Sequence, residues 1–304
     1  MYISIQYLRA ISSLAVVYYH LYENTGQQGV AIFFVISGFL MIDIMQNKSA
    51  KKFFFDRYFR IAPLYYLSLV LVLMFGIAYD PTPLRIVQSF TFTALGSVYG
   101  VGWTLTYEFV FYTIVTVSLF LFSDQKYRLG FIFVSLILLD YFINYVHHIK
   151  GYEYGNYFYL FLSGVVINLI FNNFKIIIWS NFTPVLLLAS FGYLFYGHSF
   201  GIPFYQFDVE HYLINNLVPS FLIVFLSLNL EKSHHIFKSR LLEYLGDASY
   251  SIYLSHMLII ALVTYFISDV NKIFLLIISV IMGVLIYHFL EKPITRKMKT
   301  LPLH

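Results

Sequence analysis

The chain has 304 residues, of which 60% are hydrophobic, 21% are aromatic and only 11% are charged. Soluble domains carry about 25% charged residues, so this composition excludes an ordinary soluble domain and indicates a membrane protein. The absence of cysteine excludes disulfides, thiolate metal sites and a cysteine nucleophile. The net charge of +4 is less informative, because in a membrane protein the placement of the positive residues matters more than their sum.

Apolar runs long enough to span a bilayer recur along the whole chain. We predict ten transmembrane helices, at residues 5–22, 30–46, 61–78, 101–122, 129–146, 155–173, 176–196, 211–230, 244–267 and 272–290. Turn and breaker residues separate them, and no repeat or low-complexity tract interrupts the pattern. The sequence therefore predicts an all-α integral membrane protein with a single transmembrane domain over residues 1–304.

The lysines and arginines set the predicted orientation. With the N-terminus in the cytoplasm, 16 of the 19 lie on the cytoplasmic side, and the exceptions are Arg85, Lys150 and Lys272. By the positive-inside rule we predict that both termini are cytoplasmic. The N-terminus has neither a basic region nor a small-residue cleavage site, so we expect the first helix to be retained. Residues 79–100 are too apolar for a solvated loop and are expected to lie in the interface or to fold back into the protein.

Two polar residues share one face of the first predicted helix. Arg9 and His20 are eleven positions apart, which in an α-helix is about three turns plus 20° and a rise of about 16 Å. Charged or titratable groups inside a bilayer are costly, so each is a candidate functional residue. Taken separately, His20 fits an interfacial histidine and Arg9 fits an arginine that extends to the inner interface. Because they share a face, we favour the hypothesis that Arg9 and His20 lie at two depths along one path through the membrane.

Glu108 lies about two turns into the fourth predicted helix, in the same outer half of the membrane as His20. A carboxylate at that depth needs a partner, and an imidazole is a good one. We therefore expect Glu108 to orient His20 and to stabilise its cation. A structural ion pair with an arginine, or a contact with a tyrosine, explains Glu108 equally well.

Arg57 and Arg60 lie at the predicted inner mouth of the third helix. Their spacing of three places both guanidinium groups on one face if the stretch is helical. With Lys51 and Lys52 they form a basic cluster suited to a phosphate-bearing ligand. Ordinary positive-inside topology with lipid head-group contact is the alternative.

Small and hydroxyl-bearing residues mark two further helices. In the second helix, Ser37 and Gly38 are typical of close helix packing, and they also allow a ligand to approach the backbone. In the ninth, Ser249, Tyr253 and His256 fall at helical spacing and are suited to a polar interior face. A hydrogen-bonded packing seam explains that pattern equally well. The sequence offers no ligand set for a metal.

Taken together, these segments resemble the acyltransferase-3 family of integral-membrane acyltransferases. The matches occur in the family's order: Arg9 and His20 separated by ten residues, FFVISGF at 33–39, Arg57-x-x-Arg60-Ile-x-Pro-Leu-Tyr, WTLTYEFVFY at 103–112, SYSIYLSH at 249–256 and Glu291-Lys-Pro293. Within the family, the opening segments look most like the bacterial exopolysaccharide O-acetyltransferases. The resemblance implies a multi-pass protein of the bacterial inner membrane.

The resemblance also implies a reaction. An acyl group, usually acetyl, would pass from cytoplasmic acyl-CoA to a hydroxyl of a cell-surface or lipid-linked polysaccharide. The implied partners are the acyl-CoA, the glycan acceptor and membrane lipids, with no metal and no nucleic acid. Some members carry a C-terminal hydrolase-like domain that this sequence lacks, so we expect transfer to finish in the membrane domain.

The resemblance assigns roles to four residues. His20 matches the family's essential histidine and Arg9 its paired basic residue, while Arg57 and Arg60 match the arginines thought to hold the CoA end. Where the family often has an acidic residue just before FFVISGF, this chain has Ala31. That difference removes one carboxylate from the expected site and favours Glu108 as the carboxylate that acts there.

A mechanism follows from these expectations. Arg57 and Arg60 would bind the CoA phosphates, with Arg9 and Ser37 as further cofactor-binding candidates along the pantetheine arm. His20 would act as a general base on the acceptor hydroxyl or as a nucleophile that carries the acyl group. The tetrahedral oxyanion needs hydrogen-bond donors, for which the candidates are Trp103, Tyr107, Tyr253 and His256.

Two other functions stay open at the sequence level. One is a transporter or flippase for a lipid-linked glycan, although the paired inverted halves typical of many transporters are absent from the sequence pattern. The other is an acyltransferase that acts on an amine or on a peptidoglycan sugar.

Overall fold

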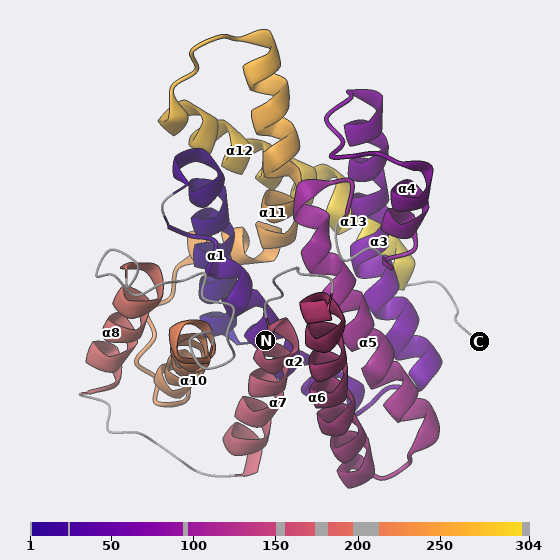
Figure 1. The fold of residues 1–304 in the computed structure, drawn as a ribbon. Helices are drawn as coiled ribbons and strands as arrows, with labels where there is room; N and C mark the ends of the chain where they lie inside the picture. The colour runs from indigo at the N-terminus through magenta and orange to yellow at the C-terminus, as the bar shows by residue number, and fades with distance from the viewer. Residues whose placement is uncertain are drawn as a thin grey trace.

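The computed structural model describes residues 2–23, 25–93, 97–149, 156–173, 182–196 and 213–299. In these ranges the regular structure is helical throughout, which confirms the predicted all-α class (Figure 1). The α-helices are α1 (Ile3–Tyr22), α2 (Gly29–Met45), α3 (Ala50–Met74), α4 (Pro83–Phe90), α5 (Trp103–Leu121), α6 (Gln125–Ile149), α7 (Tyr157–Asn173), α8 (Thr183–Tyr196), α10 (Val218–Lys232), α11 (Arg240–Phe266), α12 (Lys272–Ile286) and α13 (Lys292–Lys299). A 3-10 turn, η1 (Gly100–Gly102), precedes α5, and π-helical turns precede α10 (η3, Leu213–Leu217) and follow α12 (η4, Tyr287–Glu291). Residues 155, 176–181 and 211–212, which belong to three predicted helices, lie outside the described residues.

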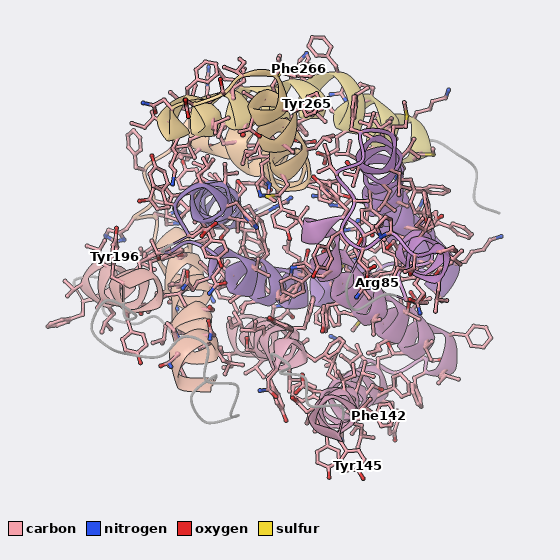
Figure 2. The ribbon with its side chains drawn as sticks, turned by 45° about the horizontal axis from the view of Figure 1, so that its top comes forward. Arg85, Phe142, Tyr145, Tyr196, Tyr265 and Phe266 are labelled. Atoms are coloured by element: carbon pink, nitrogen blue, oxygen red, sulfur yellow. The ribbon has the colours of Figure 1, made fainter. Side chains whose placement is uncertain are left out.

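Five helical stretches of the described chain are long and apolar enough to cross a membrane. They are Ala50–Met74, Gly100–Leu121, Gln125–Val146, Arg240–Phe266 and Lys272–Met298. Large aromatic side chains project from the periphery of the bundle, as Figure 2 shows for Phe142 and Tyr145 of α6 and for Tyr265 and Phe266 of α11. Such an exposed apolar surface fits a protein surrounded by lipid. The count of ten spans and the cytoplasmic placement of both termini stay predictions.

The third predicted helix begins much earlier than expected. The uninterrupted apolar run predicts a start at residue 61, but α3 begins at Ala50. The side chain of Ser49 caps it, and Pro63 is accommodated inside the helix. Arg57 and Arg60 therefore lie about 10 and 15 Å along the helix and not at its mouth. They look like boundary charges in the sequence, but in the fold they line an internal cavity.

Glycines bring helix backbones into direct contact. A Cβ added at Gly38 of α2 would lie 2.1 Å from the carbonyl oxygen of Phe161 in α7, and one added at Gly164 would lie 2.1 Å from the carbonyl oxygen of Val35. The same applies where α11 crosses α1, since a Cβ at Gly246 would lie 2.2 Å from a backbone oxygen of α1. Small residues permit this approach between membrane helices. The packing interpretation of Gly38 is thus confirmed.

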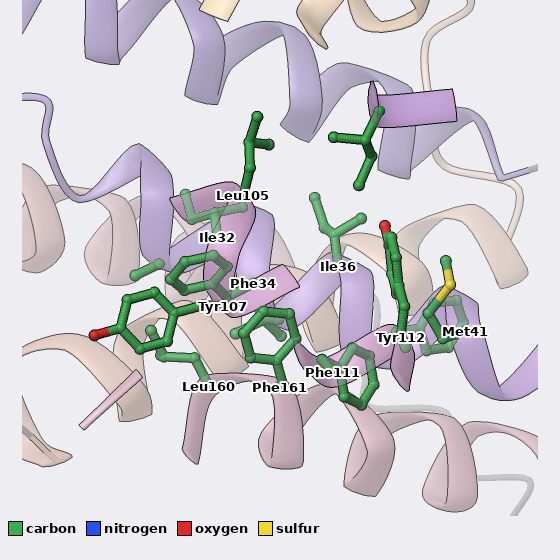
Figure 3. Packing of buried hydrophobic residues seen from close by; sticks show 14 of the residues in the cluster. Ile32, Phe34, Ile36, Met41, Leu105, Tyr107, Phe111, Tyr112, Leu160 and Phe161 are labelled. Atoms are coloured by element: carbon green, nitrogen blue, oxygen red, sulfur yellow. The ribbon is translucent and has the colours of Figure 1, made fainter. Parts of the chain in front are cut away.

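Aromatic rings fill the seam between α2, α5 and α7 (Figure 3). The ring of Phe161 lies 4.6 Å from that of Phe34 and 4.7 Å from that of Phe111, measured between centroids. All three rings are buried. Aromatic pairs add to the stability of ordinary apolar burial, so Phe161 of α7 holds both α2 and α5.

The start of α1 is anchored by a carboxylate from another helix. Glu231 of α10 accepts hydrogen bonds from the backbone N–H groups of Ile3 and Ser4, at 2.8 and 2.9 Å, and from the Ser4 hydroxyl at 2.6 Å. The first N–H groups of a helix have no partner within the helix, and a negative charge there is favourable. This contact sets the position of the helix that carries Arg9 and His20.

The connection before α5 folds back onto the bundle, which was one of the two alternatives predicted for residues 79–100. Phe92, Val98 and Tyr99 are buried. Phe92 stacks on Phe109 of α5 with 4.7 Å between ring centroids, and the Tyr99 hydroxyl donates to the carbonyl oxygen of Leu254 in α11. The connection therefore ties α5 to α11.

Candidate functional site

A cavity of about 430 Å³ lies among α1, α2, α3, α5 and α11. That volume is within the range of about 300–1,000 Å³ that is usual for small-molecule sites. Apolar side chains make up much of the wall, and its charged members are Arg9, Asp43, Arg57, Arg60 and Glu108. The three arginines come from two helices that are far apart in sequence, α1 and α3.

The arginines of the cavity lack the partners that buried cations normally have. The ion pairs within 4.0 Å in the described part of the chain join Lys48 and Lys52 to Asp56, and Arg85 to Asp80. None of them includes a cavity arginine, and the Nε atom of Arg57 is buried without a hydrogen-bond partner. Unpaired guanidinium groups facing a cavity are suited to an anionic ligand, above all to phosphate, which they bind through two parallel hydrogen bonds.

Two carboxylates of the cavity wall offset part of this positive charge, and so does the buried Glu291 of η4, which acts on Arg60 and Arg9 and accepts a hydrogen bond from the Ser251 hydroxyl at 2.6 Å. Glu108 accepts a hydrogen bond from the Ser37 hydroxyl at 2.9 Å and another from Tyr112. Asp43 is occupied by the amides of Asn168 and Asn172 of α7, at 2.7 and 3.2 Å. Each of these carboxylates has a hydrogen-bond donor other than the arginines, and none in the described chain lies within 4.0 Å of a cavity arginine, so the guanidinium groups can contact a ligand directly.

His20 lies outside this cavity, near the C-terminal end of α1, and its partner is His256 of α11. The Nδ1 atom of His20 is 3.2 Å from Nε2 of His256 and 3.0 Å from the carbonyl oxygen of Val16. The second nitrogen of His256, Nδ1, is 2.6 Å from the carbonyl oxygen of Tyr253. His256 is completely buried, whereas His20 is partly exposed.

The predicted contact between Glu108 and His20 is wrong. Glu108 faces the cavity and bonds to Ser37 and Tyr112, and His256 occupies the place beside His20. The Glu108–Tyr112 contact could have been found, because residues four apart meet on one face of a helix. The His20–His256 contact joins residues 236 positions apart, and no local signal indicates it.

Tyr253 connects the cavity with the histidine pair. Its side chain lines the cavity, and its ring centroid is 6.0 Å from that of His256. The Tyr253 hydroxyl donates to the carbonyl oxygen of Val101 at 3.0 Å and lies 2.9 Å from the Thr104 hydroxyl. Of the oxyanion candidates, His256 is thus the one that contacts His20, and Tyr253 lies next to His256.

The remaining two oxyanion candidates, Trp103 and Tyr107, lie in an aromatic cluster. The ring of Trp103 is 4.9 Å from that of Tyr157 and 6.3 Å from that of Phe34, and the ring of Tyr107 is 5.2 Å from that of Tyr157. Neither residue lines the cavity. These contacts are those of packing between α5 and α7.

The fold and this cavity define a class: a helical protein with membrane-length helices and an arginine-lined cavity suited to a phosphate-bearing ligand. The sequence model of the acyltransferase domain family matches residues 2–289. The chain belongs to this family, the acyltransferase-3 family that its motifs resemble. No solved structure matches the chain.

Named relatives agree with that assignment. The chain is 25% identical to a Staphylococcus aureus protein named "Putative O-acetyltransferase", over 95% of this chain and 56% of the relative. It is also 25% identical to the exopolysaccharide production protein ExoZ of Rhizobium meliloti, over 92% of this chain and 94% of the relative. The chain thus spans about half the length of the staphylococcal relative and nearly the whole of ExoZ.

Proposed function

We propose that this protein is a membrane O-acyltransferase that moves an acyl group, acetyl in the simplest case, from cytoplasmic acyl-CoA to a hydroxyl of a cell-surface or lipid-linked polysaccharide. The observation that carries the proposal is the cavity with three arginines and no ion-pair partner for them in the described chain. Membership of the acyltransferase family supports acyl transfer. The name of ExoZ, an exopolysaccharide production protein, supports a glycan acceptor.

In this proposal the cavity binds the donor. Arg57 and Arg60, one turn apart on α3, contact the phosphates of CoA, and Arg9 adds a third positive charge from α1. Each guanidinium can bind a phosphate through two hydrogen bonds. The apolar wall of the cavity, with Phe33 and Leu105 among its members, suits the pantetheine arm and the acyl group.

His20 is the proposed catalytic residue. The thioester reaches the part of the cavity wall formed by Thr104 and Tyr253, and the ring of Tyr253 lies 6.0 Å from that of His256, the partner of His20. His20 removes the proton of the acceptor hydroxyl as that oxygen attacks the acyl carbon. Glu108 belongs to the donor end of the site, where it holds Ser37 and Tyr112 and offsets part of the arginine charge.

The test is transfer of a labelled acetyl group. Membranes that contain the protein are incubated with labelled acetyl-CoA, and the polysaccharide is then isolated. We expect the label in the polysaccharide, its release by mild alkali as expected of an ester, and a loss of transfer of about 100-fold or more for His20→Ala. Label that resists alkali would identify an amine acceptor. Movement of glycan across the membrane without any label would identify a transporter and refute the proposal.

A further inference from the structure

The arrangement of the two histidines determines where their protons lie. A carbonyl oxygen only accepts hydrogen bonds, so Nδ1 of His256, 2.6 Å from the carbonyl oxygen of Tyr253, must carry a proton. A neutral imidazole has one protonated nitrogen, so Nε2 of His256 then carries a lone pair. His256 is completely buried, and no ion pair of the described chain reaches it. A charged form would therefore be an uncompensated buried cation, which is strongly unfavourable.

The same reasoning extends to His20. Its Nδ1 atom faces two acceptors, the carbonyl oxygen of Val16 at 3.0 Å and the lone pair of His256 Nε2 at 3.2 Å. Nδ1 of His20 must therefore carry the proton, which leaves the lone pair on Nε2. Both ends of the chain of hydrogen bonds are closed by backbone carbonyls, so the direction of donation cannot reverse while both rings are neutral.

We propose that His256 is a positioning residue that holds His20 in the tautomer protonated on Nδ1, so that Nε2 is the reactive atom. The proposal rests on the proposed role of His20 in acyl transfer. The acceptor hydroxyl gives its proton to Nε2 while its oxygen forms the bond to the acyl carbon. The carbon–sulfur bond of the thioester then breaks, and the CoA sulfur leaves with the proton from Nε2. An ester and CoA are the products.

In this proposal His256 takes the place that a carboxylate has in other catalytic sites. In hydrolytic triads a carboxylate fixes the tautomer of the histidine and stabilises its cation. Here the orienting group is neutral, and its own proton is held by the carbonyl oxygen of Tyr253. When His20 becomes protonated on Nε2, it still donates from Nδ1 to His256, so its ring does not need to turn during the reaction.

The first test compares two amide replacements of His256. The terminal group of glutamine lies about where Nε2 of histidine lies, and that of asparagine about where Nδ1 lies. His256→Gln keeps an acceptor for His20, and we expect it to retain transfer within about tenfold of wild type. His256→Asn removes the side-chain acceptor of His20 and leaves only the carbonyl oxygen of Val16, one turn back on the same helix, and we expect kcat to fall about 100-fold or more. The KM for acetyl-CoA should stay the same in both, because His256 does not line the donor cavity.

The second test measures the tautomer of His20 directly and does not depend on catalytic activity. In protein labelled with ¹⁵N-histidine, the nitrogen chemical shifts distinguish a protonated nitrogen from one with a lone pair. The chain has 10 histidines, so the signals of His20 are identified by their loss in His20→Ala. We expect Nδ1 of His20 to be protonated in the wild type and the two tautomers to mix in His256→Asn.

The outcomes separate this inference from the proposed function. A wild-type His20 protonated on Nε2, or wild-type kcat in His256→Asn, would overturn the positioning role and leave acyl transfer intact. Absence of acetyl transfer by the wild-type protein would refute the proposed function, while the tautomer measurement would still decide the geometry of the pair.

Discussion

Unpaired arginines are the most informative residues of this molecule. Each buried charge must be compensated, and a protein usually does this with a carboxylate of its own. Here the carboxylates of the cavity bond to hydroxyl and amide groups, and Arg9, Arg57 and Arg60 face a space large enough for a ligand. The cost of burying them is best explained by an anion that completes the site.

Removal of these cations should weaken donor binding. A hydrogen bond to a charged group is worth about 1.5–3 kcal/mol, so Arg57→Ala and Arg60→Ala should each raise the Kd for acetyl-CoA by about tenfold or more. Isothermal titration calorimetry of the purified protein in detergent measures this. Arg85→Ala is the matched control, because that arginine is paired with Asp80 outside the cavity.

A second ligand that lacks one phosphate shows which phosphate each arginine contacts. If an arginine contacts the 3′-phosphate, its replacement should have a smaller effect on binding of acetyl-3′-dephospho-CoA than on binding of acetyl-CoA. An unchanged affinity in the double alanine variant, with the protein still folded by size-exclusion chromatography, would show that the phosphates bind elsewhere.

At the scale of elements, helix crossings decide which side chains meet. Gly38 and Gly164 let α2 and α7 touch, and Gly246 does the same for α11 against α1. The first crossing places Ser37 toward the cavity, and the second places His256 beside His20. Glycine is required at these positions because the crossing helices leave no space for a Cβ atom, and not because the backbone needs conformational freedom.

Gly38→Ala should therefore destabilise the fold. The new Cβ would lie 2.1 Å from a backbone oxygen, and overpacking of this kind costs about 1–3 kcal/mol. Gly130→Ala in α6 is the control, because its Cβ would meet nothing within 4 Å and alanine favours a helix by about 1 kcal/mol over glycine. Thermal unfolding in detergent should show a lower Tm for the first variant and an equal or higher Tm for the second. Equal Tm values would contradict the close crossing of α2 and α7.

At the scale of the whole molecule, the distribution of charge predicts an orientation. The lysines and arginines gather on one predicted side of the membrane, the side at which the donor cavity would have to open for cytoplasmic acyl-CoA. The C-terminal helix α13 adds to that side, since it carries Lys292, Arg296 and Lys297.

The orientation can be measured directly, because the chain has no cysteine. Ser123→Cys, between α5 and α6, and Ser268→Cys, between α11 and α12, both alter exposed positions and differ only in the predicted side. A membrane-impermeant maleimide should label Ser268→Cys in intact cells, and it should label Ser123→Cys only after permeabilisation. The reverse pattern would place the donor site on the outer side of the membrane.

Local information determined much of this protein. The hydropathy of the chain predicts the helices within a few residues in most cases, because burial in lipid requires long apolar runs. It failed at α3, where Arg57 and Arg60 interrupt the apolar run although the helix continues through them. Spacing along one helix also identified candidate pairs such as Arg57 with Arg60, since a periodicity of 3.6 residues needs no knowledge of neighbours.

Only the tertiary structure decided which of these residues act together. Ser37 and Glu108 are 71 positions apart and His20 and His256 are 236 positions apart, and both contacts depend on how separate helices pack. From sequence alone His20 pairs with Glu108, because both lie in the same predicted half of the membrane. Depth is a one-dimensional property, whereas a hydrogen bond also requires two helices to present the right faces to each other. The packing of α1 on α11 places His256, and not Glu108, beside His20.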